Sequence, residues 1–297
     1  MEQSKIDIET IVKAVVNELG KTRISAPAVE QPGNERMIDL PDLTLAEHRR
    51  AIGVHKPIDE EGLRNLCSTT TARIGVGRAG PRPRTKSLLL FQMDHGVTQD
   101  AIYGEVSEEV LNKFNLFTVQ TQIEDRGQYL LRPDLGRRLS KDAKAVIAEK
   151  CVKNPQVQIV VGDGLSAAAI NNNLPVIYPV IEQGLKSAGI TLGTPFFIKY
   201  ARVGVINDVN DAIGADVVLI LLGERPGLGI ADALSAYMGW RPTAGKTDAD
   251  RDVVCMITQY GGTNPLEGGA FVAELIKKTL KYQASGVELK EKAGSER

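Results

Sequence analysis

Short apolar runs alternate with helix-length segments over the second half of the chain. The helix-length segments are residues 140–151, 175–189, 206–214 and 264–285, and the apolar runs are VQIVVGDGLS from Val157, PFFIKYARVG from Pro195, ADVVLILLGE from Ala215 and DVVCMITQY from Asp252. This alternation is typical of βαβ units, which build a parallel sheet with helices on both faces. We therefore predict an α/β fold in which residues 116–297 form a Rossmann-like, doubly wound parallel-sheet domain. In such domains ligands bind beyond the carboxyl ends of the strands.

Residues 41–115 carry helical patterns and no confident strand alternation. TLAEHRRAIG offers Thr44 as an N-cap with Glu47 three residues later, which is a capping-box spacing. DEEGLRNLCSTTTARIG opens with acids that favour a helix N-terminus, and RTKSLLLFQMDHG continues in the same style. These patterns predict a small N-terminal helical domain over residues 41–115.

Residues 1–40 combine an amphipathic helix with a flexible linker. The helix is predicted from one apolar stripe at spacings of three and four, and Gly20 ends it; the stripe is Ile8, Ile11, Val12, Val15, Val16 and Leu19. The following KTRISAPAVEQPGNER has two prolines and no periodicity, which is typical of a linker. Two interpretations remain: a terminal helix that packs on its own domain, or a docking helix for another protein.

Composition narrows the classes of partner and the compartment. The formal net charge of −1 gives no reason to expect nucleic acid or an anionic membrane as a partner. No apolar stretch is long enough to cross a bilayer, and the first residues lack a secretory signal pattern. The cysteines Cys67, Cys151 and Cys255 are widely spaced and odd in number, so neither a disulfide framework nor a zinc site is indicated. A reducing cytoplasm is the expected compartment.

Several strand ends carry polar or glycine-rich sequence. In Gly162-Asp163-Gly164, the aspartate is a candidate ligand contact, although a turn aspartate that bonds its own backbone is the commoner case. The second run ends around Ala201–Gly204, and backbone groups there are free to contact a ligand. In ILLGERPGLGIADALS, which we expect to resume as a helix, small residues let a large flat ligand approach the backbone, and Glu224 accepts from amide or hydroxyl donors.

Known catalytic motifs are scarce. The chain contains no HExxH, GxSxG or P-loop, the order G-E-R-P-G-L-G from Gly223 is not GxGxxG, and Asp94-His95 has no obvious third group. GVGRAGPRPRTK (75–86) carries four basic residues and no acid, so it clamps a phosphate, meets an acidic surface or is simply a solvated loop. The residues indicate a binding subunit with no catalytic or metal-ligating group of its own. The alternative is a stand-alone nucleotide-binding enzyme on a Rossmann-type sheet.

The chain resembles the small (light) subunit family of ethanolamine ammonia-lyase. The resemblance covers about Arg73 to Gly286, and the motifs that carry it are GRAGPRPRTKSLL, LLRPDLGRRLS, DGLS, GTPFFIKYARV, LLGERPGLG and QYGGTNPLEGGA. It implies a carbon–nitrogen lyase that converts ethanolamine to acetaldehyde and ammonia with adenosylcobalamin, through a 5′-deoxyadenosyl radical. Most catalytic residues are then expected on the large subunit, a TIM barrel, while this subunit covers the cobalamin at the interface between the two.

The resemblance also assigns residues and a location. Val203 and Glu224 match two cobalamin contacts of the family, and a third falls on Cys255, or on Val253 or Val254 where the spacing differs. Cobalamin keeps its own dimethylbenzimidazole on cobalt in this family, so no histidine ligand is expected. Such enzymes are packaged in bacterial microcompartments, and the N-terminal helix is then expected to bind the shell as a cargo signal.

Overall fold

The computed structural model describes residues 51–70, 72–228 and 230–294, all within the second of the two units of the chain, residues 42–297. The predicted helix of residues 1–40 and the Thr44 cap lie outside the described residues. The elements are α3 (Glu60–Ser68), β1 (Arg78–Ala79), β2 (Arg82–Pro83), α4 (Thr85–Tyr103), α5 (Glu108–Lys113), β3 (Phe117–Gln120), α6 (Arg126–Leu131), η1 (Leu135–Arg137), α7 (Lys141–Lys150), β4 (Val157–Gly162), α8 (Ala167–Ser187), β5 (Phe196–Lys199), α9 (Val205–Ile213), β6 (Val217–Gly223), β7 (Leu234–Trp240), η2 (Asp248–Asp250), β8 (Arg251–Ile257), α10 (Pro265–Tyr282) and α11 (Gly286–Gly294).

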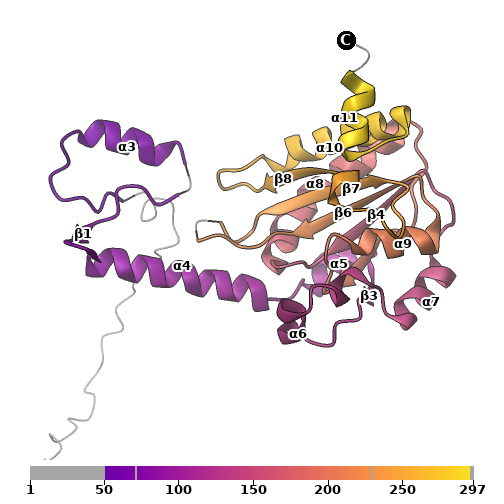
Figure 1. Cartoon of the computed structure of the whole chain (residues 1–297), viewed down its shortest axis with the longest axis horizontal. Helices are drawn as coiled ribbons and strands as arrows, with labels where there is room; N and C mark the ends of the chain where they lie inside the picture. Colours follow the sequence, from indigo (N-terminus) through magenta and orange to yellow (C-terminus); the bar gives the residue numbers. More distant parts are fainter. Residues whose placement is uncertain (1–50, 71, 229, 295–297) are drawn as a thin grey trace, which may run out of the picture. The chain divides into compact units, whose positions relative to one another are not determined.

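The main sheet has six strands in the order β3-β5-β4-β6-β7-β8 (Figure 1). The first four are parallel, and β7 and β8 are antiparallel to their neighbours. The predicted runs that form β4, β5 and β6 are parallel as expected, whereas the run that forms β8 pairs antiparallel with β7; β3 and β7 lie outside the predicted runs. Ten residues join β6 to β7 and another ten join β7 to β8, which is shorter than the crossover of about a dozen or more residues that parallel neighbours need.

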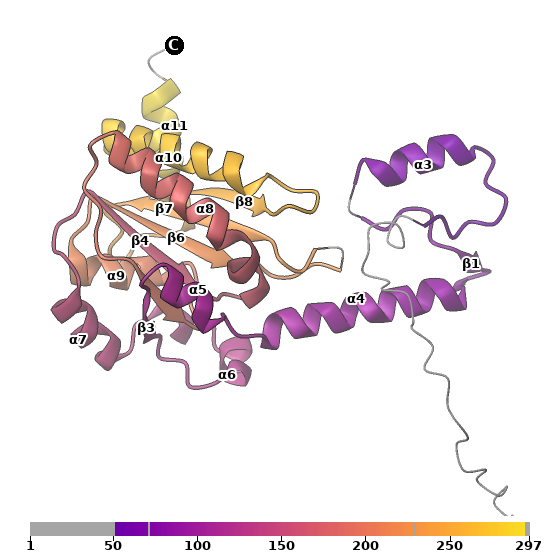
Figure 2. The same cartoon turned by 180° about the vertical axis from the view of Figure 1, so that it is seen from behind.

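Helices cover both faces of the sheet (Figures 1 and 2). Alternate residues of β4 point to opposite sides, as the two-residue period of a strand requires. Ile159 packs with α8 and α10 on one face, and Val160 packs with α7 and α9 on the other. Because both faces are covered, β4 and β6 are buried along their whole length. This burial explains their continuous apolar sequence.

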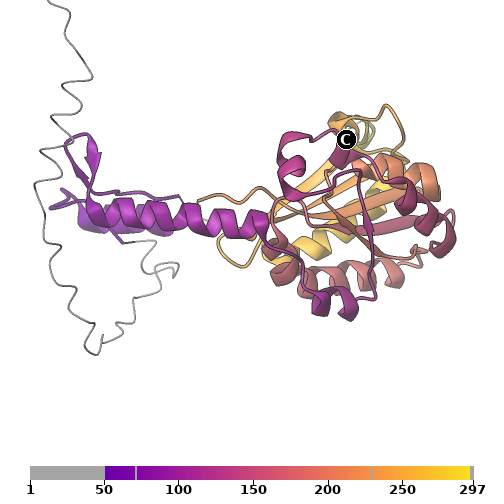
Figure 3. The ribbon, with the colours of Figure 1, turned by 90° about the horizontal axis from the view of Figure 1, so that it is seen from below.

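The described residues before the sheet contain the helices α3, α4 and α5 and one two-stranded hairpin. α3 begins after Asp59, whose carboxylate accepts from the backbone N–H of Gly62 at 2.8 Å. β1 and β2 pair as a short antiparallel hairpin directly before α4. Figure 3 shows α4 as one continuous helix. The boundary between a helical domain (41–115) and a sheet domain (116–297) stays a prediction.

The glycine-rich stretch after β6 differs from the sequence prediction. We expected it to resume as a helix, but residues 224–233 form the loop of a hairpin and β7 follows from Leu234. The backbone N–H of Glu224 donates to the carbonyl of Ala233 at 2.9 Å and closes this hairpin loop. Leu234, Ala236 and Met238 alternate into the core, so the strand period prevails over a composition that favours helix.

Candidate cofactor pocket

The three residues singled out from the sequence lie toward the carboxyl ends of the parallel strands. Glu224 directly follows β6 and is half-buried. Cys255 is an exposed residue of β8, and β7 lies between β8 and β6 in the sheet. Val203 sits in the turn between β5 and α9, where it packs against the core on the α9 face of the sheet. Three separate elements therefore position them.

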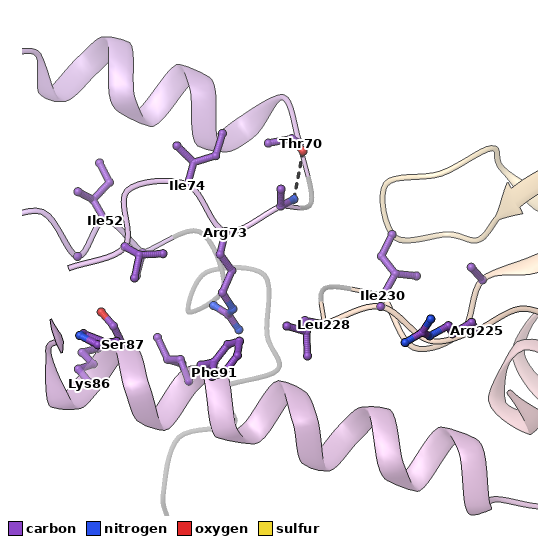
Figure 4. A pocket seen from close by; sticks show the side chains of 18 of the residues that line it. Ile52, Thr70, Arg73, Ile74, Lys86, Ser87, Phe91, Arg225, Leu228 and Ile230 are labelled. Atoms are coloured by element: carbon purple, nitrogen blue, oxygen red, sulfur yellow. Dashed lines mark hydrogen bonds between the residues drawn. The ribbon is translucent and has the colours of Figure 1, made fainter. Parts of the chain in front are cut away.

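A cavity of about 1180 Å³ brings Glu224 and Cys255 together. Its walls come from residues 51–53, from the segment 70–91 that includes the start of α4, from the hairpin loop, and from β7 and β8 (Figure 4). Val203 does not line this cavity, and neither do Val253 and Val254. Among the candidates for the third contact, Cys255 alone faces it.

Tyr237 of β7 holds the carboxylate of Glu224. Its hydroxyl donates a hydrogen bond to Glu224 Oε1 at 2.7 Å, and both residues line the cavity. Burial first, and then the hydrogen bond and charge of Glu224, raise the pKa of the Tyr237 phenol, so it remains a protonated donor at neutral pH. No residue that the structure describes donates to Glu224 Oε2, which leaves one carboxylate oxygen able to accept from a ligand.

The remaining walls of the cavity are mostly apolar. Ile74, Phe91, Leu228 and Ile230 contribute hydrophobic side chains from both sides, as Figure 4 shows. A cavity of this size, with apolar walls and a few placed polar groups, is the usual form of an organic-ligand site. The site is therefore suited to a large, mainly apolar ligand that offers hydrogen-bond donors to Glu224.

Asp94 and His95 do not form the polar pair that their adjacency allowed. Asp94 is 4% exposed and pairs with Arg73, whose Nη2 lies 2.7 Å from Asp94 Oδ1 and whose Nε contacts the other oxygen. The His95 ring instead meets Phe91 edge-on, with the ring centroids 4.6 Å apart. The buried ion pair joins the segment after α3 to α4 and so holds one wall of the cavity in place.

Asp163, the other candidate contact, belongs to a closed polar cluster. It is 2% exposed, and its carboxylate lies 3.1 Å from Arg126 Nη2 and accepts from the Ala201 N–H at 3.0 Å. Burial raises the pKa of Asp163, against the opposing charge of Arg126. The Arg126 guanidinium also lies over the rings of Tyr129 and Tyr200. The cluster joins the ends of β4 and β5 and offers no opening to a ligand.

Gly164 needs its glycine because the chain comes too close to β6 for a side chain. Its φ is +56°, and a Cβ there would lie 2.1 Å from the carbonyl oxygen of Gly223. Ser166 begins the next helix as predicted, because its hydroxyl accepts from the N–H of Ala169 at 3.1 Å. The Gly-Asp-Gly motif is thus explained by packing between strand ends.

Two residues of these clusters were missed from the sequence. Tyr237 lies just beyond the stretch expected to resume as a helix, and the alternation in LSAYMGW, which favours a strand, is the signal that identifies its segment. Arg126 precedes no recognisable motif, and only the fold brings it to Asp163. Among the described residues, no group of three His, Cys, Asp or Glu side chains is arranged to hold a metal ion, and no helix is both long and apolar enough to span a membrane.

Comparison with known proteins agrees with the motifs. The family model described as Ethanolamine ammonia-lyase light chain (EutC) matches residues 60–290. The chain is 42% identical over 290 residues to the ethanolamine ammonia-lyase small subunit of Clostridium perfringens, with 96% of this chain and 98% of that protein covered. It is 40% identical over 293 residues to that of Fusobacterium nucleatum (97% and 99% covered) and 39% identical over 290 residues to that of Listeria monocytogenes (96% and 99%). The chain therefore belongs to the ethanolamine ammonia-lyase small-subunit family.

Proposed function

We propose that this chain covers adenosylcobalamin at its interface with the large subunit of ethanolamine ammonia-lyase, which converts ethanolamine to acetaldehyde and ammonia. The observation that carries the proposal is the meeting of Glu224, Tyr237 and Cys255 in one large cavity. Glu224 follows β6 and Cys255 belongs to β8, and the family resemblance assigns a cobalamin contact to each. The chain belongs to a family of small subunits, and a small subunit implies a large subunit as its partner.

The residues of the cavity fit a corrinoid. The cavity volume of about 1180 Å³ exceeds the roughly 300–1,000 Å³ of ordinary ligand pockets, as the edge of a macrocycle requires. A corrin ring carries amide side chains, and Glu224 Oε2 is placed to accept from such an N–H. A Cβ added at Gly227 would have its nearest neighbour, the carbonyl oxygen of Ile230, 3.9 Å away, so the hairpin loop presents little bulk to a flat ring edge.

The role of this chain is binding and orientation. When bound, adenosylcobalamin supplies the radical that removes a hydrogen atom from ethanolamine. The Tyr237 hydroxyl orients Glu224, Glu224 holds a ligand donor, and the apolar side chains of the hairpin loop exclude water from that face. Val203 contacts the ligand only at a part that extends beyond the cavity, because it lies outside the cavity lining. The groups that touch ethanolamine are expected on the large subunit.

An absorbance titration of adenosylcobalamin tests the proposal. The full chain is titrated alone and together with the large subunit, and ethanolamine turnover is measured with and without prior exposure of the cofactor to light. We expect a spectral change and light-sensitive turnover only when both chains are present. The absence of a spectral change in both titrations would show that the chain does not contact cobalamin.

We also propose that the N-terminal helix directs the enzyme to a bacterial microcompartment shell. The support is the apolar stripe of residues 8–19 followed by a linker, a pattern typical of tethered docking helices. Deletion of residues 1–30 is expected to leave turnover unchanged and to abolish encapsulation, measured as the fraction of enzyme that co-purifies with intact shells. Retained encapsulation would contradict this role.

A further inference from the structure

The basic segment found in the sequence forms one end of the same cavity. Arg78, Arg84 and Lys86 line the cavity from the hairpin β1–β2 and the first turn of α4, and Figure 4 shows Lys86 at that end. All three are exposed. The hairpin holds the two arginines together, because Arg84 Nε donates to the carbonyl of Arg78 at 3.2 Å and Arg78 Nη1 donates to the carbonyl of Pro81 at 3.1 Å.

The charge of this end of the cavity is not balanced. No residue that the structure describes gives Arg78, Arg84 or Lys86 a carboxylate partner, whereas Arg73 in the same lining is paired with Asp94. Glu224 is the single acid among the described lining residues, and it belongs to the opposite wall. Uncompensated cations that share one concave wall create a positive potential, which attracts an anionic group of a ligand.

We propose that Arg78, Arg84 and Lys86 form a subsite that binds the phosphate group of the ligand held in this cavity. Each arginine uses one nitrogen on a backbone carbonyl and keeps further N–H donors for phosphate oxygens. Phosphate is favoured over an acidic protein surface because the cations line a concave cavity whose next residues, Ile74 and Phe91, suit an organic body attached to the phosphate. The inference rests on the proposed function for the identity of that ligand, since cobalamin carries a phosphodiester in its nucleotide loop.

Arg82 provides a matched control. It is a fourth exposed basic residue in the same segment, but it does not line the cavity. Substitution of any of these four residues by glutamine removes one charge and retains most of the side-chain length. Loss of an exposed side chain's charge is not expected to unfold the protein, and thermal unfolding of each variant confirms this before binding is measured.

The test uses two corrinoids that differ by the phosphate group alone, adenosylcobinamide and adenosylcobinamide phosphate. Each is titrated into the full chain assembled with the large subunit, and the ratio of the two dissociation constants is recorded. We expect the wild-type complex to bind the phosphate form about tenfold more tightly, the effect of one charge-assisted hydrogen bond. R84Q and K86Q are expected to lower that ratio at least about threefold, and R82Q to leave it unchanged.

The outcomes separate this inference from its rivals. An unchanged ratio in R84Q and K86Q would overturn the phosphate subsite. If these variants weaken association of the two subunits without cofactor and leave the ratio unchanged, the segment meets an acidic partner surface and the inference is wrong. If the adenosylcobalamin titration itself shows no binding, the proposed function fails, and titration of the full chain with inorganic pyrophosphate decides the subsite. Binding that R84Q loses and R82Q keeps would support an anion site, and its absence would overturn it.

Discussion

Two polar clusters lie at the same edge of the sheet, and they differ in how fully their hydrogen bonds are satisfied. Asp163 is 2% exposed and is held by Arg126 and the backbone of Ala201. Glu224 is half-buried and receives one hydrogen bond, from Tyr237, among the described residues. The first cluster uses its polar groups internally, while the second keeps acceptor capacity facing a cavity. Spare hydrogen-bonding capacity next to a cavity, more than position at a strand end, marks the residue available to a ligand.

The largest expected effect is a loss of stability on substitution of Asp163. D163A leaves the Arg126 guanidinium, 13% exposed, without its carboxylate, and removal of one partner of a buried ion pair costs about 3–5 kcal/mol of unfolding free energy. Urea denaturation at neutral pH measures this loss, with D163N as a second variant that keeps the side-chain shape. D134N, which breaks the exposed Arg132–Asp134 pair, is the control and is expected to leave stability unchanged. A stable D163A that loses cofactor affinity would show that this cluster binds ligand.

The second prediction concerns Glu224, where we expect the opposite result: a loss of cofactor affinity with little loss of stability. E224A removes a charged acceptor from the cavity, so we expect cofactor affinity to fall by about 1.5–3 kcal/mol, or roughly tenfold or more. Unfolding free energy is expected to change by less than about 0.5 kcal/mol, as for substitutions that leave no buried partner uncompensated. E291A on the exposed α11 is the control. Unchanged cobalamin affinity in E224A would remove Glu224 from the site.

A smaller effect is expected at Tyr237. Y237F keeps the ring and deletes the hydroxyl that orients Glu224, so affinity is expected to fall by about 0.5–1.5 kcal/mol, the net value of one neutral hydrogen bond. The double variant Y237F/E224A is expected to bind no worse than E224A, because Tyr237 acts through that carboxylate. Y178F, at a buried tyrosine outside the cavity lining, is the control. Additive losses would mean that Tyr237 contacts the ligand directly.

The sequence predicted the strands whose residues are buried on both sides. β4, β5 and β6 consist mainly of Val, Ile, Leu and Phe, and each corresponds to a predicted apolar run. β7, with Ser235, Ala236 and Gly239, has weak strand propensity and depends on pairing with both neighbours. β3 is four residues long, too short for periodicity to identify. The mixed direction of the sheet follows from the two short connections beside β7.

The candidate site was predictable one residue at a time, but not as a site. Glu224 stood out because an acid at a glycine-rich strand end is unusual, and the family resemblance assigned it a role. Its bond to Tyr237 depends on the register in which β6 pairs with β7, and the length of the hairpin loop sets that register. The cavity is lined both by residues of the segment 51–91 and by residues of the segment 224–256, which are far apart in the sequence. No local pattern encodes such a meeting.

The smallest effect is expected at Cys255, and it sharpens the comparison because the chain contains its own controls. Cys255 is exposed in the cavity wall, while Cys67 and Cys151 are 5% and 7% exposed. A thiol is a weak hydrogen-bonding group, so we expect C255S to lower cofactor affinity by about threefold at most. A thiol reagent is expected to modify Cys255 first in the free chain, and bound cofactor with the large subunit should slow that reaction while the two buried thiols stay unreactive. If the labelling rate is unaffected and V254A lowers affinity instead, the third contact belongs to Val254, and the cavity wall at β8 is not the cofactor-facing surface.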